Sequence, residues 1–523
     1  MIETLAALPD TARLEADICI VGGGAAGIAL AHELRGAGLT ILLAESGGET
    51  DSGEARSFNI VEEAGHPFPG AVEGRARRLG GATTLWAGQS LPLDPIDFDS
   101  RPWVPHSGWP IGHDTLAPYW ARAERFLKLA GMRYDEAAWR HLGAEPPAFD
   151  PEALRPQVSR LSRNRNFARL YRDDLARAAD VRVLLDATTV AIVPPAGDRG
   201  RYRIRLRTRA GRDATAEAGT VVVCCGGLDT PRLLLASTEG APAGLGNERD
   251  LVGRFLMDHP TAYCAEVLDP DFDRLVHHFR PFYRREGRLF PKIALAEAVQ
   301  RRVGVLNATS ELVFTAPADA AFATAKAFYG SLKGGDPVAA ALRAMKVAGR
   351  LDEVARFAWT RAVKRRLPAA KGSRIQVWAH IEQEPDPESR VTLSAERDAL
   401  GMPRARLDWR LGELDRRTFR VFAETVGAEF ARLGLGRVAP APWLDDEAGW
   451  RDAVQDFYHH IGTARMADDP SRGVVDADLQ VHGHPGLHVA SSAVFPTGGA
   501  SNPTLTILAL TLRLADRIKA RAG

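Results

Sequence analysis

The sequence has few cysteines and no long apolar run. Four cysteines occur among 523 residues, Cys19, Cys224, Cys225 and Cys264, and no two form a CxxC pair. Three of them lie in apolar, strand-like segments, which favours buried thiols of a reducing compartment over a disulfide scaffold. No stretch approaches the ~18 apolar residues that cross a bilayer. The N-terminus also lacks the basic and apolar regions of a signal peptide, so we predict a cytoplasmic protein without a transmembrane segment.

An excess of charge of either sign is lacking as well. Lysine and arginine number 67, aspartate and glutamate 66, and the net charge is +1. Bulk electrostatics therefore favours neither nucleic acid nor an anionic membrane as a partner, and we expect no nucleic-acid partner. Hydrophobic residues make up 45% and charged residues 25% of the chain, which is ordinary for a soluble globular protein. At this length two or more domains are expected.

A glycine-rich turn stands near the start of the chain. The apolar run at residues 17–21 predicts a buried strand, residues 28–36 a helix, and residues 39–44 a second strand that ends in Glu45. The turn between strand and helix carries GxGxxG spacing at Gly22, Gly24 and Gly27. Such glycines allow a tight turn and close approach of a pyrophosphate, and the helix N-terminus supplies N–H donors. Glu45 is placed for a ribose diol, so the segment predicts a dinucleotide site.

A second glycine-rich loop distinguishes between the dinucleotides. Residues 77–88 read RRLGGATTLWAG, and no second GxGxxG unit follows. Two backbone-exposing loops suit a large cofactor that crosses the protein, which favours FAD over NAD. The alternative is that Gly80 and Gly81 only turn a corner.

The remaining pattern predicts two interleaved domains. Strands are expected at residues 181–194, 202–208 and 220–225. Gly226-Gly227 and Thr230-Pro231 then lead into a helix at 232–236, a typical parallel-sheet connection. Further strands are expected within 263–313 and at 374–381, 389–393 and 405–409, with an amphipathic helix at 415–433. We predict an α/β protein: a Rossmann-like FAD-binding domain with a parallel sheet, interleaved with an α+β substrate domain whose sheet is mostly antiparallel. The FAD-binding domain is assigned residues 1–100, 156–260 and 450–523, a lid segment 101–155, and the substrate domain 261–449.

Two features of the substrate domain have open interpretations. Residues 316–367 predict a mainly helical insert with basic side chains. The insert either touches a partner or membrane surface, or it is a solvated lid or an oligomer helix. Its basic side chains are Lys326, Lys333, Lys346, Arg356, Lys364, Arg365 and Arg366. Glu382, Gln383 and Glu384 end the strand at 374–381 and either line a substrate pocket or lie exposed.

Two polar clusters mark the C-terminal stretch 457–510. His459-His460 and Ser501-Asn502 flank a turn-rich segment and a short apolar strand at 487–489. A helix is expected from Pro503 to about Ala520, because proline fits the first turn of a helix. Asn502 is then the N-cap, with its side chain held in place. A fixed amide and an imidazole beside a redox cofactor could bind a hydroxyl and remove its proton.

Five motifs in order resemble the glucose–methanol–choline (GMC) family of flavin oxidoreductases over nearly the whole chain. They are DICIVGGGAAGIALAHEL, RRLGGATTLWAGQS, VVVCCGGLDTPRLLLAS, VGRFLMDHP, and YHHIGTARM with the segment that ends GGASNPTLTILAL. The resemblance implies an enzyme that oxidises an alcohol to a carbonyl, with hydride passing to flavin N5. The YHxxGT match places His459 as the base, and the NPT match places Asn502 as its partner. This His/Asn pairing is similar to that of pyranose, glycoside and cholesterol oxidases.

The resemblance also carries expectations for cofactor and substrate. Pyranose 2-oxidases attach FAD through a histidine in the loop that matches TTLW, where this chain has Leu85, so FAD should be noncovalent. The substrate is expected to be a secondary alcohol of a sugar or glycoside, or otherwise a polyol, sterol or natural-product intermediate. Oxygen, a quinone or another acceptor would reoxidise the flavin. The predicted FAD contacts are Gly22, Gly24, Ala26, Gly27, Glu45, Ser46, Arg78, Gly80, Gly81, Thr84, Trp86, Ala87, Val190, Ala493, Asn502 and Thr504.

Alternatives remain at individual residues and for the reaction. His460 competes with His459 for the role of base, since spacing alone does not choose between them. His259, in MDHP, is assigned a structural hydrogen bond rather than chemistry. His482, His484 and His488 lack an acidic or cysteine partner at metal-binding spacing, so no metal is predicted. The alternative reactions are a non-redox GMC-type lyase, light-driven decarboxylation, and a flavin monooxygenase or halogenase.

Overall fold

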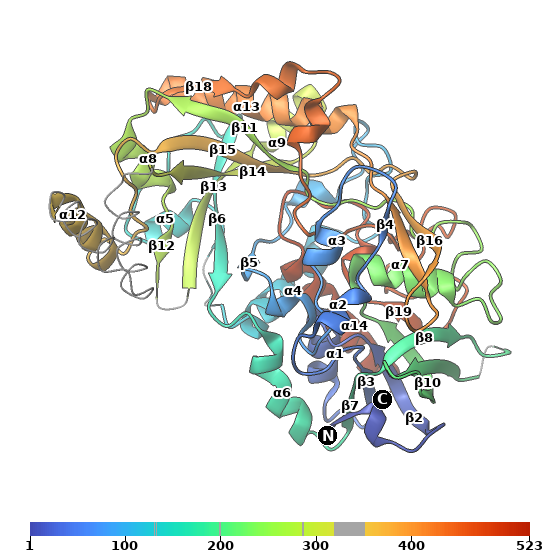
Figure 1. Ribbon diagram of the computed structural model, residues 1–523. Coiled ribbons are helices and arrows are strands. Elements are labelled where there is room, and N and C mark those ends of the chain that lie inside the picture. Colours follow the sequence, from blue (N-terminus) through green and yellow to red (C-terminus); the bar gives the residue numbers. More distant parts are fainter. Residues whose placement is uncertain (130, 132, 198–199, 285–286, 318–350, 523) are drawn as a thin grey trace, which may run out of the picture.

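The computed structural model describes residues 1–129, 131, 133–197, 200–284, 287–317 and 351–522. Two eight-stranded sheets dominate it, one in the lower right of Figure 1 and one in the upper left. The N- and C-terminal ends lie near each other below the first sheet.

The first sheet is parallel at its centre. Its strand order is β1-β7-β3-β2-β10-β9-β8, with β19 paired to β10, and only β9 and β8 run antiparallel to their neighbours. The first half of β2 alternates between exposed and buried residues, whereas its last four residues are all buried, as expected of a parallel strand covered on both faces. The bounds are β1 (Ile2–Thr4), β2 (Arg13–Val21), β3 (Ile41–Ala44), β7 (Val181–Leu185), β8 (Thr188–Val193), β9 (Tyr202–Arg207), β10 (Asp213–Val223) and β19 (Leu487–Val489).

Helices from both ends of the chain cover this sheet. The N-terminal α1 (Ala25–Leu34) packs against the C-terminal α14 (Thr504–Ala522) and against α6 (Phe167–Arg177). On its other side α14 contacts α4 (His113–Phe126). The α1–α14 contact brings the C-terminal polar clusters beside the N-terminal glycine turn.

The second sheet is antiparallel and has its own apolar core. Its order is β18-β11-β15-β14-β13-β6-β5, with β12 paired to β13. The long helix α13 (Glu413–Leu433) lies over it in Figure 1. The strand bounds are β5 (Gln89–Ser90), β6 (Leu154–Ser162), β11 (Thr261–Leu268), β12 (Phe282–Tyr283), β13 (Gly287–Leu295), β14 (Ala308–Thr315), β15 (Arg374–Ile381) and β18 (Arg437–Pro440).

A small third sheet and short helices complete the described fold. The third sheet has the order β16-β17-β4 and contacts α7. The remaining bounds are β4 (Glu62–Glu63), β16 (Arg390–Arg397), β17 (Pro403–Asp408), α2 (Gly53–Ser57), α3 (Gly70–Glu73), α5 (Ala137–His141), α7 (Gly226–Ala236), α8 (Phe272–Phe279), α9 (Glu297–Val303), α12 (Leu351–Ala362), η1 (Leu5–Ala7), η2 (Gly81–Thr84), η3 (Pro95–Phe98), η4 (Pro442–Asp445), η5 (Trp450–Ala453) and η6 (Ser492–Val494).

The predicted fold class is confirmed by these sheets and their pairing. The domain boundaries drawn from the sequence stay a prediction; β5 and β6, which fall in the first 100 residues and across residues 155–156, both pair within the second sheet. Among the helices that the structure describes, none is long and apolar enough to cross a bilayer. All four cysteines are free, and only Cys225 is more than slightly exposed.

Helix α7 begins earlier than the sequence predicts. It starts at Gly226 rather than at residue 232, so Pro231 lies inside it. Proline has no N–H, which leaves the carbonyl four residues before it without its helical donor. Here the Thr463 hydroxyl donates to the Gly227 oxygen at 2.6 Å. A side chain from the C-terminal stretch therefore makes the interior proline tolerable.

The start of α14 corrects the expected N-cap. The helix begins at Thr504, and Ile507 N donates to Pro503 O at 2.9 Å. Pro503 thus takes the capping position, and Asn502 lies one residue before it. Among the described residues, the Asn502 side chain has no hydrogen-bond partner.

Smaller differences occur at three other elements. Helix α1 spans Ala25–Leu34 rather than residues 28–36. The predicted strand at 181–194 is two strands, β7 and β8, which turn at Asp186, whose φ is 50°.

The strand end at residues 382–384 is not exposed. Arg101 donates to Glu382 through both terminal nitrogens, at 2.7 and 2.6 Å, and both side chains are fully buried. The Gln383 amide oxygen accepts from Trp409 Nε1 at 2.9 Å. Glu384 is half-buried. The expectation of an exposed strand end was wrong, because Glu382 and Gln383 belong to a buried hydrogen-bonded network. A place in the substrate pocket stays a prediction.

The basic insert is described only in part. Residues 318–350, with Lys326, Lys333 and Lys346, lie outside the described residues, as does the side chain of Arg356. Arg366 is buried and stacks on Phe282, with its guanidinium carbon 3.6 Å from the ring centroid. Arg366 therefore does not belong to an exposed basic surface, whereas Lys364 and Arg365 are exposed.

Candidate active site

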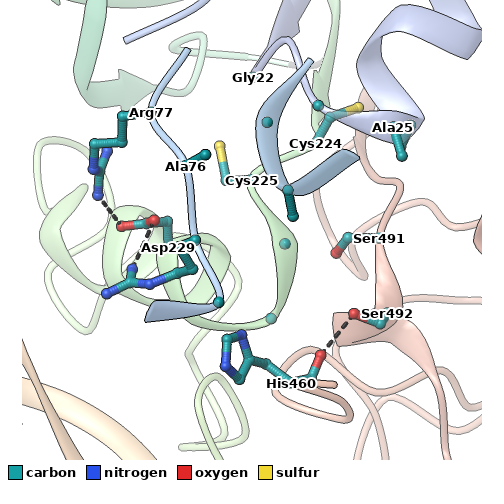
Figure 2. Close-up of a pocket in the computed structure, with 18 of the residues that line it drawn as sticks. Gly22, Ala25, Ala76, Arg77, Cys224, Cys225, Asp229, His460, Ser491 and Ser492 are labelled. Atoms are coloured by element: carbon teal, nitrogen blue, oxygen red, sulfur yellow. Dashed lines mark hydrogen bonds and ion pairs between the residues drawn. The ribbon is translucent and has the colours of Figure 1, made fainter. Parts of the chain in front are cut away.

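A cavity of about 590 Å³ lies beside the N-terminus of α1. Segments far apart in the sequence line it, including the β2–α1 turn, the end of β3, the loop after η2, the start of α7, residues 457–460, and the start of α14. Figure 2 shows Gly22 and Ala25 on one side and Cys225, His460 and Ser492 around the same space. The parallel sheet therefore presents the carboxyl ends of β2, β3 and β10 to it, which is the usual ligand site of such sheets.

The three motif glycines have different roles. Gly22 has a φ of +103°, and a Cβ there would lie 2.7 Å from the Cys224 oxygen. Gly22, Gly24 and Ala26 line the cavity. Gly27 does not; a Cβ on it would lie 1.9 Å from the Gly22 oxygen. Gly27 therefore permits the close packing of α1 on the turn, while the others leave the backbone open to a ligand.

The Glu45 side chain connects the β2–α1 turn to the segment that follows β3. Its Oε2 accepts from Gly23 N at 2.8 Å, and its Oε1 accepts from Gly47 N at 2.8 Å. Burial raises the pKa of this carboxyl, while the two N–H donors act in the opposite direction. Glu45 and Ser46 both line the cavity.

The second glycine loop lies directly against the first. Gly80 N donates to Gly23 O at 2.8 Å, and a Cβ on Gly81 would lie 2.9 Å from Gly24 Cα. Beyond Gly81, the side of the cavity is formed by Leu85, Trp86 and Ala87. The two loops that the sequence singled out thus form one surface.

Several predicted FAD contacts lie away from this surface. Arg78 and Thr84 line a separate hollow near α6. Gly80, Val190 and Ala493 are not among the lining residues, although their neighbours Gly81, Thr189 and Ser492 are. Thr504 and Asn502 line the cavity.

His459 lines the cavity, and hydrogen bonds to Asp258 hold its backbone in place. His459 N donates to Asp258 Oδ2 at 2.9 Å, and Phe457 N donates to Asp258 Oδ1 at 2.9 Å. The ring makes an edge contact with Phe457 and places Nδ1 2.9 Å from His259 Nδ1. Burial, with His259, His460 and Lys292 nearby, lowers the pKa of His459 well below 6.5. The side chain is therefore a neutral imidazole at neutral pH.

Comparisons with known proteins agree with this geometry. The family model described as GMC oxidoreductase matches residues 385–511. The chain is 24% identical to the fructose dehydrogenase large subunit of Gluconobacter japonicus, over 97% of this chain and 98% of that protein. It is 29% identical to a C-glycoside 3-oxidase of Microbacterium trichothecenolyticum, over 66% of this chain and 56% of that protein. The crystal structure of pyridoxine 4-oxidase from Mesorbium loti has the same fold, with a TM-score of 0.57 and 19% identity over 96% of this chain and 98% of that one.

The chain resembles the GMC oxidoreductases, and the family model matches its C-terminal part at residues 385–511. It is an enzyme of flavin-dependent alcohol oxidation, and its cofactor is FAD, as the resemblance implied.

The cavity of this protein fits FAD on its own geometry. The N-terminus of α1 and the bare backbone at Gly22 and Gly24 suit a pyrophosphate. His460 lines the same cavity, and its buried Nε2 has no partner among the described residues. A polar atom of a bound group would satisfy that nitrogen, since a buried polar atom without a hydrogen bond is costly.

The sequence did not distinguish His460 from His459 by spacing, but their contacts differ. The carbonyl oxygen of His460 accepts from the Ser492 hydroxyl at 2.6 Å, and a Cβ on Gly227 would lie 2.3 Å from the same oxygen (Figure 2). Its ring packs on Phe68 at 5.3 Å, and burial lowers its pKa to about 3. Both residues line the cavity, so the choice of base remains a prediction.

An ionic cluster at the cavity was missed by sequence reasoning. Asp229, in the first turns of α7, accepts from Arg75 at 2.9 Å and from Arg77 at 2.6 Å (Figure 2). Burial alone would raise the pKa of Asp229, but the guanidinium groups of Arg77, Arg75 and Arg232 lower it overall. All four side chains line the cavity. No local signal reveals the cluster, because more than 150 positions separate Asp229 from Arg75 and Arg77.

His482 and His484 have different hydrogen-bond partners. His482 Nε2 lies 2.9 Å from Ala467 O, His484 Nε2 lies 3.0 Å from Glu248, and His488 is buried in β19. Two groups of side chains around Asp258 lie close enough together to hold a metal ion. One group contains His259 and His459, and the other contains Asp456 and His460. The Asp258 oxygens already accept three backbone N–H groups, including His259 N at 2.6 Å. Asp258 is therefore a clamp between two backbone segments.

Proposed function

We propose that this enzyme oxidises a secondary alcohol of a sugar or glycoside to a ketone, with His459 as the base and Asn502 as its hydrogen-bonding partner. One observation carries the proposal. His459 and Asn502, 43 positions apart, line the same cavity as the glycine turn of the FAD site. They reach it through the clamp at Asp258 and through the packing of α14 on α1.

The two side chains have different roles toward the substrate hydroxyl. Neutral His459 accepts the hydroxyl proton at Nε2, the ring nitrogen that has no partner among the described residues. The Asn502 amide donates a hydrogen bond to the substrate oxygen as it gains negative charge. Bound FAD would supply the hydride acceptor. The carbinol carbon would lose a hydride, which carries both electrons, and the hydroxyl would lose its proton to His459, so that a C=O bond forms. Leu85 stands at the loop position discussed above and has no group for a covalent flavin bond, which supports noncovalent FAD.

A polar network behind the cavity supports a polyhydroxylated substrate. Gln89 lines the cavity, and its amide nitrogen donates to Ser159 at 2.6 Å and to Glu311 at 2.8 Å. The Lys292 ammonium lies 3.2 Å from Glu311 and is buried. The amide nitrogen of Gln89 donates both of these hydrogen bonds. They fix the orientation of the amide group and leave its carbonyl oxygen as an acceptor. The sugar and glycoside names of the relatives support the same substrate class.

Anaerobic flavin reduction tests the proposed function. Sugars, glycosides, polyols and sterols are mixed with the holoenzyme without oxygen, and bleaching of the visible flavin band is followed. We expect a sugar or glycoside to bleach the flavin, with a ketone as product. Bleaching by sterols or simple polyols only would assign the substrate to the alternative class, and no bleaching by any alcohol would refute alcohol oxidation. Air is then admitted, and reoxidation by oxygen is compared with reoxidation by a quinone.

The rate of flavin reduction should not fall as the pH is lowered from neutral to 6.5. Burial lowers the pKa of His459 well below 6.5, and a base whose pKa is lowered gains its proton only at a lower pH. The acid side of the rate profile should therefore decline below 6.5, not at it. Anaerobic stopped-flow traces across the pH range measure this. A decline centred at or above 6.5 would contradict a buried neutral His459 as the base.

Gln89→Leu should weaken sugar oxidation more than oxidation of a simple alcohol. The change removes the acceptor that faces the cavity while keeping the volume similar. We expect KM for the sugar to rise roughly 2- to 10-fold, the range for one hydrogen bond, and KM for a monohydroxy alcohol to stay level. Steady-state kinetics with both substrates checks this. An equal rise for both alcohols would mean that Gln89 shapes the cavity without contacting the additional hydroxyl groups.

A further inference from the structure

A line of hydrogen-bonding groups runs from the protein interior to His459. His259 is fully buried, and its Nε2 lies 3.3 Å from the backbone oxygen of Gly498. Its other nitrogen, Nδ1, lies 2.9 Å from Nδ1 of His459. The two rings meet edge to face at 5.0 Å between centroids. Three groups from separate parts of the chain therefore lie in series.

The carbonyl at the inner end fixes the direction of the donors. A carbonyl oxygen only accepts, so His259 carries its proton on Nε2 and donates to Gly498 O. In a neutral imidazole the other nitrogen is then an acceptor, and burial lowers the pKa of His259 to about 4. His459 must therefore donate from Nδ1 to His259. Its own Nε2 is left without a proton.

Both ends of this series are held by the fold. Asp258 Oδ1 accepts from His259 N at 2.6 Å and Oδ2 accepts from His459 N at 2.9 Å, so one carboxylate fixes both backbones. The residue before Gly498 is held as well, because the Thr497 hydroxyl donates to Asp97 O at 2.8 Å. Trp109 Nε1 in turn donates to that hydroxyl at 2.9 Å. The relative placement of the two imidazoles is thus set by buried bonds on either side.

We propose that His259 is a positioning residue that sets the tautomer of His459, so that His459 presents an unprotonated Nε2 to the substrate. The inference rests on the proposed function, because it assigns to His459 the role of base. It extends that function by giving the second histidine, which the sequence suggested to be structural, a part in the chemistry. Without the His259 acceptor, His459 would also populate the tautomer that carries its proton on Nε2, and this form has no lone pair for the hydroxyl proton.

Two substitutions separate a tautomer effect from packing. His259→Leu fills much of the space but removes the acceptor. His259→Asn keeps a carbonyl oxygen near the position of Nδ1. We expect His259→Leu to lower the rate constant of flavin reduction roughly 10- to 100-fold, as for other outer groups that orient a histidine, with little change in the substrate concentration at half-saturation. His259→Asn should recover most of the rate. His484→Leu, at a histidine that does not line the cavity, is the control and should leave the rate unchanged.

A second measurement needs no turnover. In protein labelled with ¹⁵N at the histidine rings, the His459 signals are assigned by their loss in His459→Gln. We expect a proton on Nδ1 and none on Nε2 in the wild type and in His259→Asn, and a mixture of tautomers in His259→Leu. A proton on Nε2 of His459 in the wild type would overturn the inference, as would equal rates in the Leu and Asn variants. Failure of the proposed function is distinct from either result, because then no alcohol reduces the wild-type flavin, whatever the tautomer.

Discussion

His459→Ala is expected to slow flavin reduction by an alcohol roughly 10²- to 10⁴-fold, the usual contribution of a general base. The imidazole is partly buried, neutral and held beside the cavity by the Asp258 clamp and by His259. Alanine leaves the hydroxyl proton without an acceptor at that place. Anaerobic stopped flow with the substrate found in the screen measures the rate constant directly.

The comparison with His460→Ala makes this result specific. His460 lines the cavity and has an unpaired buried Nε2, so its loss should weaken FAD binding more than it slows the reduction step. A normal flavin content together with a rate loss in His459→Ala, and the reverse pattern in His460→Ala, is the expected outcome. A near wild-type rate in His459→Ala with a large loss in His460→Ala would show that the roles were assigned to the wrong histidine. His484→Ala, at a histidine away from the cavity lining, again serves as the control.

Arg101→Leu is expected to destabilise the enzyme by about 3–5 kcal/mol, the range for removing one partner of a buried ion pair. Both side chains of the Arg101–Glu382 pair are fully buried, so leucine at residue 101 leaves a carboxylate without its cation. The midpoint of urea unfolding, followed by far-ultraviolet circular dichroism, should move to a clearly lower concentration.

A double replacement tests whether the unpaired charge is the cause. Adding Glu382→Leu to Arg101→Leu removes the stranded carboxylate and should recover a large part of the lost stability, since apolar replacements of both partners are often tolerated. Arg140→Ala breaks an exposed pair with Glu136 and should leave the midpoint unchanged. If the double variant unfolds at the same midpoint as Arg101→Leu, the unpaired carboxylate is not the cause of the lost stability, and the pair contributes through its packing.

Hydrogen bonds connect the Arg101–Glu382 pair to the active site. Glu382 Oε2 accepts from Asn307 N at 3.1 Å, and the Asn307 amide donates to Asp97 at 2.8 Å. Asp97 lies under the loop at residues 497–499, where a Cβ on Gly499 would meet its carboxylate at 2.3 Å. That loop supplies the Gly498 carbonyl to His259. Loss of Arg101 is therefore expected to reach the His259–His459 contact as well as global stability.

The sequence by itself determined the features that depend on neighbours along the chain. An apolar run, glycines at fixed spacing and a terminal carboxylate predicted β2, the β2–α1 turn and Glu45 at the end of β3, because a tight turn and a helix N-terminus are local properties. Strand β15 was predicted with its observed bounds, since its apolar run is bounded by turn residues on both sides. The order of motifs was enough to identify the family and FAD.

Tertiary structure alone decided what depends on distant partners. Glu382 could be read as pocket or surface until its cation, 281 positions away, was seen. Pro231 lies inside α7 because a threonine from the C-terminal stretch satisfies the carbonyl that it leaves. The contact of His259 with His459 joins residues 200 positions apart. A hydrogen bond needs atoms within about 3 Å, and sequence spacing carries no information on which distant segments the fold brings that close.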